Sequence, residues 1–305
     1  MAPPEERLPV GFVGLGVLGS AIVPHLLADG YPVVGHDTAP EKIDALAGLG
    51  LARAASPREA AERSELVVTC LPSVAALDDV VSGPAGIDKA AHGGAVVLEI
   101  STLPVRDKAR AREALAATGR VMLDCPVSGN RIQAQRRQLT AFASGDRAAC
   151  DRVAPVLAAF TRKHHYVGEF GCGMKMKLVG NILNLVHNAV AAEVMALGMK
   201  SGLDPGLIHE VISGSASSSA MFEVRGAMMA RNDYRHEGMN FSIPLKDARI
   251  IAEHAAELAC PIPIYQAALQ LYYAAVAQGH HDEDAAAVCA AAERAANVRR
   301  TEPER

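Results

Sequence analysis

The chain has 305 residues, of which 50% are hydrophobic and 21% charged, and its net charge is −4. Length and composition predict a folded protein of about two ordinary domains and exclude a disordered chain. The small negative charge, without a basic block, argues against nucleic acid or an anionic membrane surface as a partner.

Short apolar runs alternate with helical patterns through the first half of the chain. The apolar runs predict buried strands at residues 10–13, 32–35, 66–69, 95–98 and 121–123. Helical patterns lie between them at residues 20–28, 40–47, 57–63 and 104–117. This alternation predicts βαβ units, and therefore a doubly wound, mostly parallel sheet with helices on both faces.

The pattern changes near residue 170, where the strand signals stop. One long helix is predicted over residues 174–200, and further helices over 205–213, 219–230, 245–258, 264–277 and 284–298. We therefore expect an α/β domain over residues 8–170, an all-helical domain over 171–298 and a charged tail over 299–305.

The six cysteines are scattered without a Cys-x-x-Cys pair, which is typical of buried thiols in a reducing compartment. Residues 1–9 lack the layout of a signal peptide, and no uninterrupted apolar run reaches the roughly 18 residues of a membrane span. We expect a cytoplasmic protein. The acidic and histidine-rich run 280–284 is a poor chelate, so we expect no metal there and a helix cap at Asp282 or Asp284.

A glycine-rich turn follows the first predicted strand and fits G-x-G-x-x-G. Its residues are Gly14, Leu15, Gly16, Val17, Leu18 and Gly19. The first glycine allows a tight turn, the second lets the backbone approach a pyrophosphate, and the third lets the helix pack close to the strand. The bare motif is a weak signal, but the strand before it and the helix after it predict a dinucleotide site.

Asp37 ends the next predicted strand and bears on the choice of cofactor. A carboxylate at this place accepts hydrogen bonds from the ribose hydroxyls of NAD and repels the 2′-phosphate of NADP. Thr38 and Ala39 follow, so no arginine stands there to hold that phosphate. This favours NAD over NADP, while the alternative is that Asp37 caps the helix beginning near Pro40.

Four polar residues share one face of the long predicted helix: Lys177, Asn181, Asn184 and Asn188. One interpretation is a solvated face. The other is a row of buried hydrogen-bonding groups in a cleft between the domains, because asparagines within a helix cost stability. A partly buried lysine can exchange a proton near neutral pH, so Lys177 is the candidate acid–base group, whereas Lys175 points to another face.

The loop after the fifth predicted strand contains Ser128 and Gly129. Its hydroxyl and backbone N–H groups could hold a small carboxylate, although the composition alone fits an ordinary turn.

Taken together, these motifs resemble the β-hydroxyacid dehydrogenase family, of the 3-hydroxyisobutyrate dehydrogenase and tartronate semialdehyde reductase type. The resemblance covers nearly the whole chain, through residues 11–19, 70–72, 99–102, 124–129, 171–181 and 246–247. It implies a Rossmann domain followed by a helical domain, an active site between them, a small hydroxy-acid or semialdehyde substrate, and a homodimer or homotetramer.

The resemblance also implies roles for individual residues. Lys177 matches the family's catalytic lysine, which takes the hydroxyl proton while hydride passes to the nicotinamide, and returns it in the reverse direction. The positions that match substrate-binding residues are Ser101, Ser128, Gly129 and Asn181. Those that match cofactor contacts, beside the glycine-rich turn and Asp37, are Leu71, Pro72, Thr102 and Lys246.

Several positions depart from the family pattern. Asn130 replaces the second glycine of a Ser-Gly-Gly loop, Arg131 follows it, Arg137 replaces another usual glycine, and Gly180 stands where asparagine is common. We hypothesise that Asn130 or Arg131 reshapes the acid-binding end of the pocket. The alternative for Arg131 is a solvated loop arginine.

Two other functions compete with a hydroxy-acid dehydrogenase. One is an imine reductase of the same fold, and the other is a non-catalytic dinucleotide-binding module. Relatives of both kinds generally lack the lysine, so Lys177, together with Asn181 and the Ser128 loop, argues against them.

Overall fold

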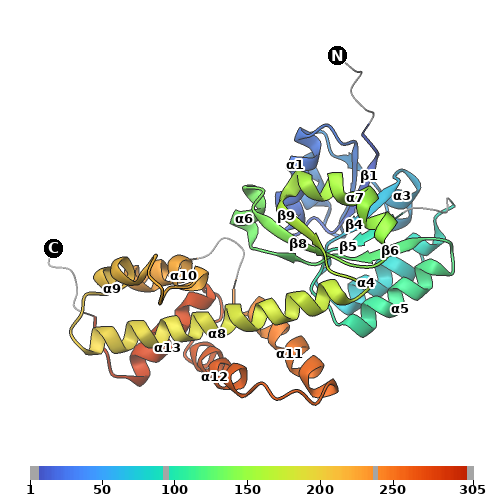
Figure 1. Ribbon diagram of the computed structural model, residues 1–305. Coiled ribbons are helices and arrows are strands. Elements are labelled where there is room, and N and C mark those ends of the chain that lie inside the picture. Colours follow the sequence, from blue (N-terminus) through green and yellow to red (C-terminus); the bar gives the residue numbers. More distant parts are fainter. Residues whose placement is uncertain (1–6, 92–95, 236–239, 301–305) are drawn as a thin grey trace. The chain divides into compact units, whose positions relative to one another are not determined.

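The computed structural model describes residues 7–91, 96–235 and 240–300 (Figure 1). The chain divides into two compact units, Met1–Lys177 and Leu178–Arg305. The first unit is α/β and the second is helical in its described part, so the predicted fold class is confirmed.

A sheet of six parallel strands forms the centre of the first unit. In chain order the strands are β1 (Val10–Val13), β2 (Val33–His36), β3 (Ala52–Arg53), β4 (Leu66–Thr69), β5 (Val96–Glu99) and β6 (Val121–Asp124). Their spatial order is β3-β2-β1-β4-β5-β6. The direction of winding reverses between β1 and β4, and α/β sheets bind ligands at the carboxyl ends of the strands beside such a switch point.

Helices cover both faces of this sheet, because alternate strand residues point to opposite sides. On one face, α1 (Gly19–Ala28), α2 (Pro40–Ala47) and α7 (Arg147–Phe160) pack with Phe12 of β1. On the other face, α3 (Pro57–Glu62), α4 (Val74–Ser82) and α5 (Val105–Ala116) pack with Val13 of the same strand. The two apolar clusters fix the register of each strand and hence the position of the loops at its carboxyl end.

A second, smaller sheet follows the first. It contains β7 (Val127–Ser128), β8 (Leu139–Ala143) and β9 (Thr161–Tyr166), with α6 (Arg131–Gln135) between β7 and β8. Strand β8 is central, antiparallel to β7 and parallel to β9. Of these three strands, the sequence predicts only an edge strand next to His164 and His165. Both histidines lie in β9, which is an edge strand of the sheet.

The helical unit is built around α8 (Cys172–Lys200), which begins in the first unit and continues into the second. It is followed by α9 (Pro205–Ile212), α10 (Ala220–Arg231), α11 (Ser242–Glu257), α12 (Pro263–Ala277) and α13 (Val288–Ala295). A 3₁₀ turn, Ala285–Ala287, precedes α13, and Asp284 caps it by accepting a hydrogen bond from the Ala286 N–H at 2.8 Å. The capping prediction for Asp284 is thereby confirmed.

Helix α8 has 29 residues and a mean hydropathy of 1.4 over its most apolar stretch, so by length and composition it is able to cross a membrane. A core helix of a globular protein passes the same test. Asn188 of α8 is fully buried, and its amide donates to the Tyr272 hydroxyl at 2.8 Å and the Ala285 carbonyl at 2.9 Å. These contacts with the rest of the helical unit are those of a core helix.

Candidate active site

The glycine-rich turn connects β1 to α1, and the glycines meet different surroundings. Gly14 has φ +97°, and a Cβ there would lie 2.2 Å from the Cys70 carbonyl oxygen. A Cβ on Gly19 would lie 2.1 Å from the Gly14 carbonyl oxygen, whereas one on Gly16 would meet nothing within 4 Å. Close packing therefore requires the first and third glycines, and the backbone at Gly16 faces open space of the kind a pyrophosphate needs.

Asp37 follows β2 and holds the glycine-rich turn. Its Oδ2 accepts a hydrogen bond from the Leu15 N–H at 2.8 Å, and its Oδ1 accepts one from the Ala39 N–H at 2.9 Å. Lys42 Nζ lies 3.3 Å from Oδ1. Burial alone would raise the pKa of Asp37, but these three donors outweigh it and hold the pKa below its usual value.

The helix-cap interpretation of Asp37 is corrected by this geometry. Helix α2 has Ala39 as its N-cap, without a side-chain cap, and Asp37 makes a local turn before it. An ionised carboxylate at the carboxyl end of β2 remains beside the glycine-rich turn, where a ribose hydroxyl is bound in sheets of this type.

The loops after β4 and β5 are tied to each other. The Leu71 N–H donates to Ser101 Oγ at 2.7 Å, and the Ser101 N–H donates to both carboxylate oxygens of Glu99, at 2.9 and 3.1 Å. Pro72 is exposed, and Thr102 is half-buried. Thus Leu71, Pro72, Ser101 and Thr102 come together at the carboxyl ends of neighbouring strands, next to the end of β1.

The predicted substrate loop lies at the end of β7. Ser128 is half-buried and pairs with Thr140 of β8. Gly129 has φ +133°, and a Cβ there would lie 2.6 Å from Leu139 Cδ2, so glycine is required at this position.

The structure gives Asn130 a capping role. Its side chain accepts a hydrogen bond from the Gln133 N–H at 3.0 Å, and the Gln133 side chain accepts one from the Asn130 N–H at 2.9 Å. This reciprocal pair is a capping box at the start of α6. The capping box fixes the side chain of Asn130, and the hypothesis that Asn130 or the half-buried Arg131 reshapes the acid-binding end of the pocket stays a prediction.

Arg137 occupies a backbone conformation that usually requires glycine. Its φ is +55°, in the left-handed region. The guanidinium donates to both carboxylate oxygens of Asp29, at 2.7 and 2.8 Å, and to His25 Nδ1 at 3.2 Å. The hydrogen bond from Arg137 is the main cause that lowers the pKa of Asp29. These contacts offset the backbone strain, so the departure from glycine at this position is structural.

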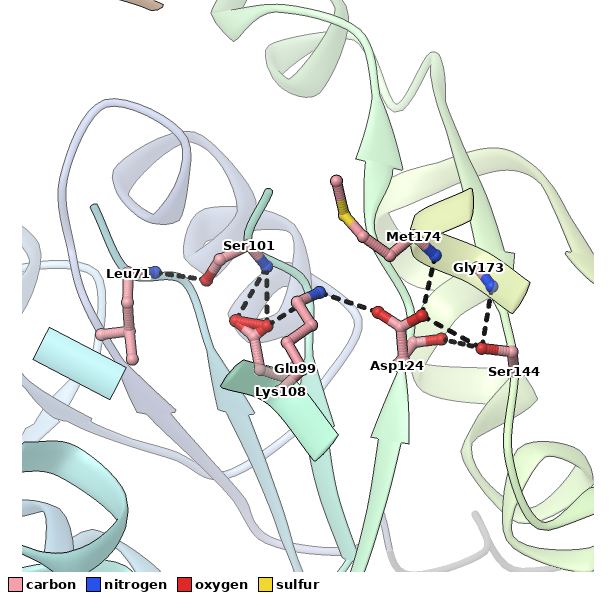
Figure 2. Close-up of polar contacts among 8 residues, drawn as sticks. All are labelled: Leu71, Glu99, Ser101, Lys108, Asp124, Ser144, Gly173 and Met174. Carbon is pink, nitrogen blue, oxygen red and sulfur yellow. Dashed lines mark hydrogen bonds and ion pairs between the residues drawn. The ribbon is translucent and has the colours of Figure 1, made fainter. Parts of the chain in front are cut away.

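Lys177 lies in the second turn of α8 and is buried, with 8% of its surface exposed, while Lys175 is exposed as predicted. The first turn of α8 is anchored to β6 and to the end of β8. The Met174 N–H donates to Asp124 Oδ2 at 2.7 Å, and the Gly173 N–H donates to Ser144 Oγ at 2.9 Å (Figure 2). The backbone that carries Lys177 therefore starts from a fixed point on the sheet.

Asn181 is one turn beyond Lys177 and belongs to a polar cluster of the helical unit. Its amide donates to Asp247 Oδ2 at 2.8 Å, and Lys246 Nζ lies 2.9 Å from Asp247 Oδ1. Asn184 donates to Asn181 Oδ1 at 3.3 Å. The interpretation of this stripe as a solvated face is wrong for Asn188, which is fully buried. Asp247 contacts both Asn181 and Lys246, and the sequence places it only within the matching segment 246–247, without a role of its own.

Sequence reasoning missed a buried group of charges under this site. Glu99, Lys108 and Asp124 are fully buried, and Lys108 forms an ion pair with each of the two carboxylates. The available signal was an acidic residue at the end of each of two neighbouring apolar strands, because two such carboxylates require a buried cation.

The sequence and fold match known proteins along nearly the whole chain. A family profile described as the NAD binding domain of 6-phosphogluconate dehydrogenase matches residues 9–168. A second, described as NAD-binding of NADP-dependent 3-hydroxyisobutyrate dehydrogenase, matches residues 171–292.

Individual relatives agree with these profiles. The L-threonate dehydrogenase of Cupriavidus necator is 34% identical over 92% of this chain and 94% of its own length. The mitochondrial 3-hydroxyisobutyrate dehydrogenase of Mus musculus is 30% identical over 93% of this chain and 86% of its own length. The crystal structure of 3-hydroxyisobutyrate dehydrogenase from Salmonella typhimurium superimposes with a TM-score of 0.83 at 31% identity, over 93% of this chain and 99% of that one.

The first profile alone spans more than half of the chain, and the relatives extend the match over nearly all of it. The site geometry agrees with this match, because the glycine-rich turn and the loops after β4 and β5 lie where a dinucleotide is bound. The chain therefore belongs to the β-hydroxyacid dehydrogenase family and is an oxidoreductase of hydroxyl donors with NAD(P)-binding domains.

Proposed function

We propose that this enzyme interconverts a small 3-hydroxy acid and its semialdehyde or keto acid, with Lys177 as the acid–base residue. The observation that carries the proposal is Lys177 itself, a buried lysine at the anchored start of α8, one turn before Asn181. Desolvation by itself favours the neutral form of an amine, which is the form that takes the hydroxyl proton in oxidation.

In the direction of oxidation, the neutral amine of Lys177 takes the hydroxyl proton as the C=O bond forms. In reduction, the ammonium of Lys177 gives its proton to the carbonyl oxygen. The hydroxyl of Ser128 and the N–H groups at Gly129 hold the substrate carboxylate, and Asn181, oriented by Asp247, fixes the reacting oxygen. The nicotinamide, when bound, accepts or supplies the hydride.

NAD is the proposed cofactor. The open backbone at Gly16 fits a pyrophosphate, and the carboxylate of Asp37 fits ribose hydroxyls better than a 2′-phosphate. Leu71, Pro72, Thr102 and Lys246 complete the proposed cofactor contacts. Lys42 is a cation close to Asp37, but it is already paired with that carboxylate.

The test is NAD(P)H absorbance at 340 nm with NAD and NADP, against L-threonate, 3-hydroxyisobutyrate and other small hydroxy acids. We expect Lys177→Ala to lose turnover by about a hundredfold or more while cofactor affinity is kept. The exposed neighbour Lys175→Ala is the matched control and should keep full activity. Turnover of Lys177→Ala at the wild-type rate would refute the assignment.

The same assay separates the alternative functions. Wild-type protein that binds NADH but turns over no acid would favour an imine reductase or a binding module. Reduction of a cyclic imine would then distinguish these two, because only the reductase consumes NADPH or NADH in its presence.

We further propose that the enzyme is a homo-oligomer through α8. A stripe of apolar residues with heptad spacing is exposed on this helix, comprising Met176, Leu183, Val190 and Leu197, which are 46%, 54%, 49% and 69% exposed. A second copy would cover such a face. Light scattering after size exclusion should give a multimer for the wild type and a smaller species for Leu183→Lys with Val190→Lys.

A further inference from the structure

Three charged side chains meet beneath the predicted site without any contact with solvent (Figure 2). Glu99 and Asp124 are register partners at the carboxyl ends of the parallel strands β5 and β6. Lys108 of α5 reaches between them, with Nζ 3.2 Å from Glu99 Oε2 and 2.8 Å from Asp124 Oδ1. Without this ammonium, two buried carboxylates would stand side by side and repel each other.

The Asp124 side of the group holds the first turn of α8. Its second carboxylate oxygen accepts the hydrogen bond from the Met174 N–H at 2.7 Å. Ser144 is fully buried; its hydroxyl accepts from the Gly173 N–H at 2.9 Å and donates to Asp124. These N–H groups have no partner within the helix, so the carboxylate and the hydroxyl fix where α8 begins.

Glu99 holds the loops after β4 and β5, which contain residues proposed to contact the cofactor and the substrate. Both oxygens of Glu99 accept from the Ser101 N–H, and Ser101 Oγ accepts from the Leu71 N–H at 2.7 Å. A single ammonium therefore connects the backbone that leads to Lys177 with the backbone of the loops after β4 and β5 (Figure 2).

We propose that Lys108 is a positioning residue for catalysis: it sets the distance between the first turn of α8, which is followed directly by the turn that contains Lys177, and the Leu71–Ser101 loops. This inference rests on the proposed role of Lys177. Lys108 touches neither substrate nor cofactor, because it is fully buried beneath the strands. Its effect is transmitted through Asp124 and Glu99.

The charge state of the group supports a rigid ionic link. Desolvation on burial would lower the pKa of Lys108, but Asp124 and Glu99 outweigh it, and the pKa is raised above the usual value. The ammonium is therefore kept through the neutral range.

The experiment compares three variants of the full chain by stopped-flow absorbance at 340 nm and by NADH titration. Lys108→Met keeps the length of the side chain and removes its charge. Ser144→Ala keeps both ion pairs of Lys108 and removes the hydroxyl that accepts from the Gly173 N–H and donates to Asp124. The matched control is Arg120→Met, another buried cation, which lies directly before β6 at the opposite end of the strand and donates to the Ala90 carbonyl at 2.6 Å.

We expect Lys108→Met to slow the single-turnover hydride step by about 10- to 100-fold, because small displacements of reacting groups have effects of this size. Ser144→Ala should slow it about threefold to tenfold. For both variants the Kd of NADH should stay within about threefold of wild type, and Arg120→Met, although destabilised, should react at the wild-type rate. If Lys108 only stabilised the fold, Lys108→Met and Arg120→Met would have the same hydride rate.

An equal hydride rate in Lys108→Met and Arg120→Met would overturn the proposal. If Lys108→Met does not fold, Ser144→Ala decides alone: a slowed step with unchanged NADH affinity supports the link, and a wild-type rate overturns it. Lys177→Ala belongs in the same series. If it loses the hydride step while Lys108→Met does not, only this inference fails, whereas a wild-type rate in Lys177→Ala would refute the proposed function and this inference with it.

Discussion

The glycine-rich turn allows a test that separates binding from folding. Gly16→Ala and Gly19→Ala add the same methyl group to two glycines of one motif, in opposite surroundings. At Gly16 the new Cβ would meet nothing within 4 Å, and at Gly19 it would lie 2.1 Å from the Gly14 carbonyl oxygen and 3.0 Å from Phe12 Cε1. The methyl group at Gly16 therefore fits the protein without a bound ligand, whereas the methyl group at Gly19 clashes with the protein itself.

The magnitudes follow from these distances. A carbon–oxygen contact of 2.1 Å must open by about 1 Å, which moves α1 away from the turn; overpacking of this kind costs about 1–3 kcal/mol. Gly16→Ala should leave the free energy of unfolding within about 1 kcal/mol of wild type, because the methyl group meets no atom of the protein and alanine restricts the unfolded chain. Its methyl group, however, would occupy the place proposed for the pyrophosphate.

The assay pairs urea unfolding with NADH titration by fluorescence. For Gly16→Ala we expect wild-type stability and an NADH Kd raised about tenfold or more, equivalent to about 1.4 kcal/mol. For Gly19→Ala we expect lost stability. A folded Gly16→Ala protein that binds NADH with the wild-type Kd would refute the reasoning, because the pyrophosphate would then not lie against this backbone.

Three further predictions concern single side chains. Asp37→Asn keeps an acceptor for the Leu15 N–H but removes the charge, so the ratio of kcat/KM for NAD to that for NADP should fall about tenfold; an unchanged ratio contradicts the role of Asp37. Arg137→Ala keeps the left-handed backbone and loses the partly exposed ion pair, which should lower the free energy of unfolding by about 0.5–1 kcal/mol at pH 7. The pKa of Asp29 is lowered in the folded state, so this contribution is fully present above its unfolded pKa and is lost as the pH falls through the lower folded pKa. Urea unfolding at pH 7 and pH 3 should therefore show a smaller deficit at pH 3, and an equal deficit at both values would count against the ion pair. Arg131→Ala should change the ranking of acid substrates by kcat/KM at 340 nm, and an unchanged ranking would leave Arg131 as a solvated loop residue.

The main elements were predictable because their signals are local. Strands β1 and β4 have the predicted bounds, β2 is shifted by one residue and β6 is one residue longer, since each is a buried apolar run. The first residue of the predicted run 95–98 lies outside the described residues, and the two-residue strand β3 was not predicted. The small second sheet was not predicted as a sheet. Strand β7 has only two residues, and β9, Thr161–Tyr166, is largely exposed and carries mostly polar side chains, so neither shows an apolar alternation.

Site residues could be predicted from the sequence where a motif requires one residue type at a fixed spacing. They could not be predicted where their role depends on burial in the folded protein. The turn at Gly14 follows from its spacing, but the burial of Lys108 does not. That lysine lies in a helix of mixed charge, Val105–Ala116, whose sequence is typical of a solvated surface. Only the register of β5 and β6 brings Glu99 beside Asp124 and creates the need for a cation. The role of Asp247 as a partner of Asn181 likewise depends on a contact between distant residues, whereas the cap at Asn130 had a local signal in Gln133 three residues later.

The course of α8 has a consequence for how such an enzyme can be altered by recombination. The division between the two compact units falls between Lys177 and Leu178, within one unbroken helix. Exchange of gene segments at that point would join two half-helices, whereas exchange in the loop before Cys172 would replace the whole helix. In the second case Lys177 and Asn181 are inherited as one block, and the incoming first turn must still offer its N–H groups to Asp124 and Ser144. Hybrid enzymes made from relatives should therefore succeed more often with a junction in the loop than with one at the apparent boundary.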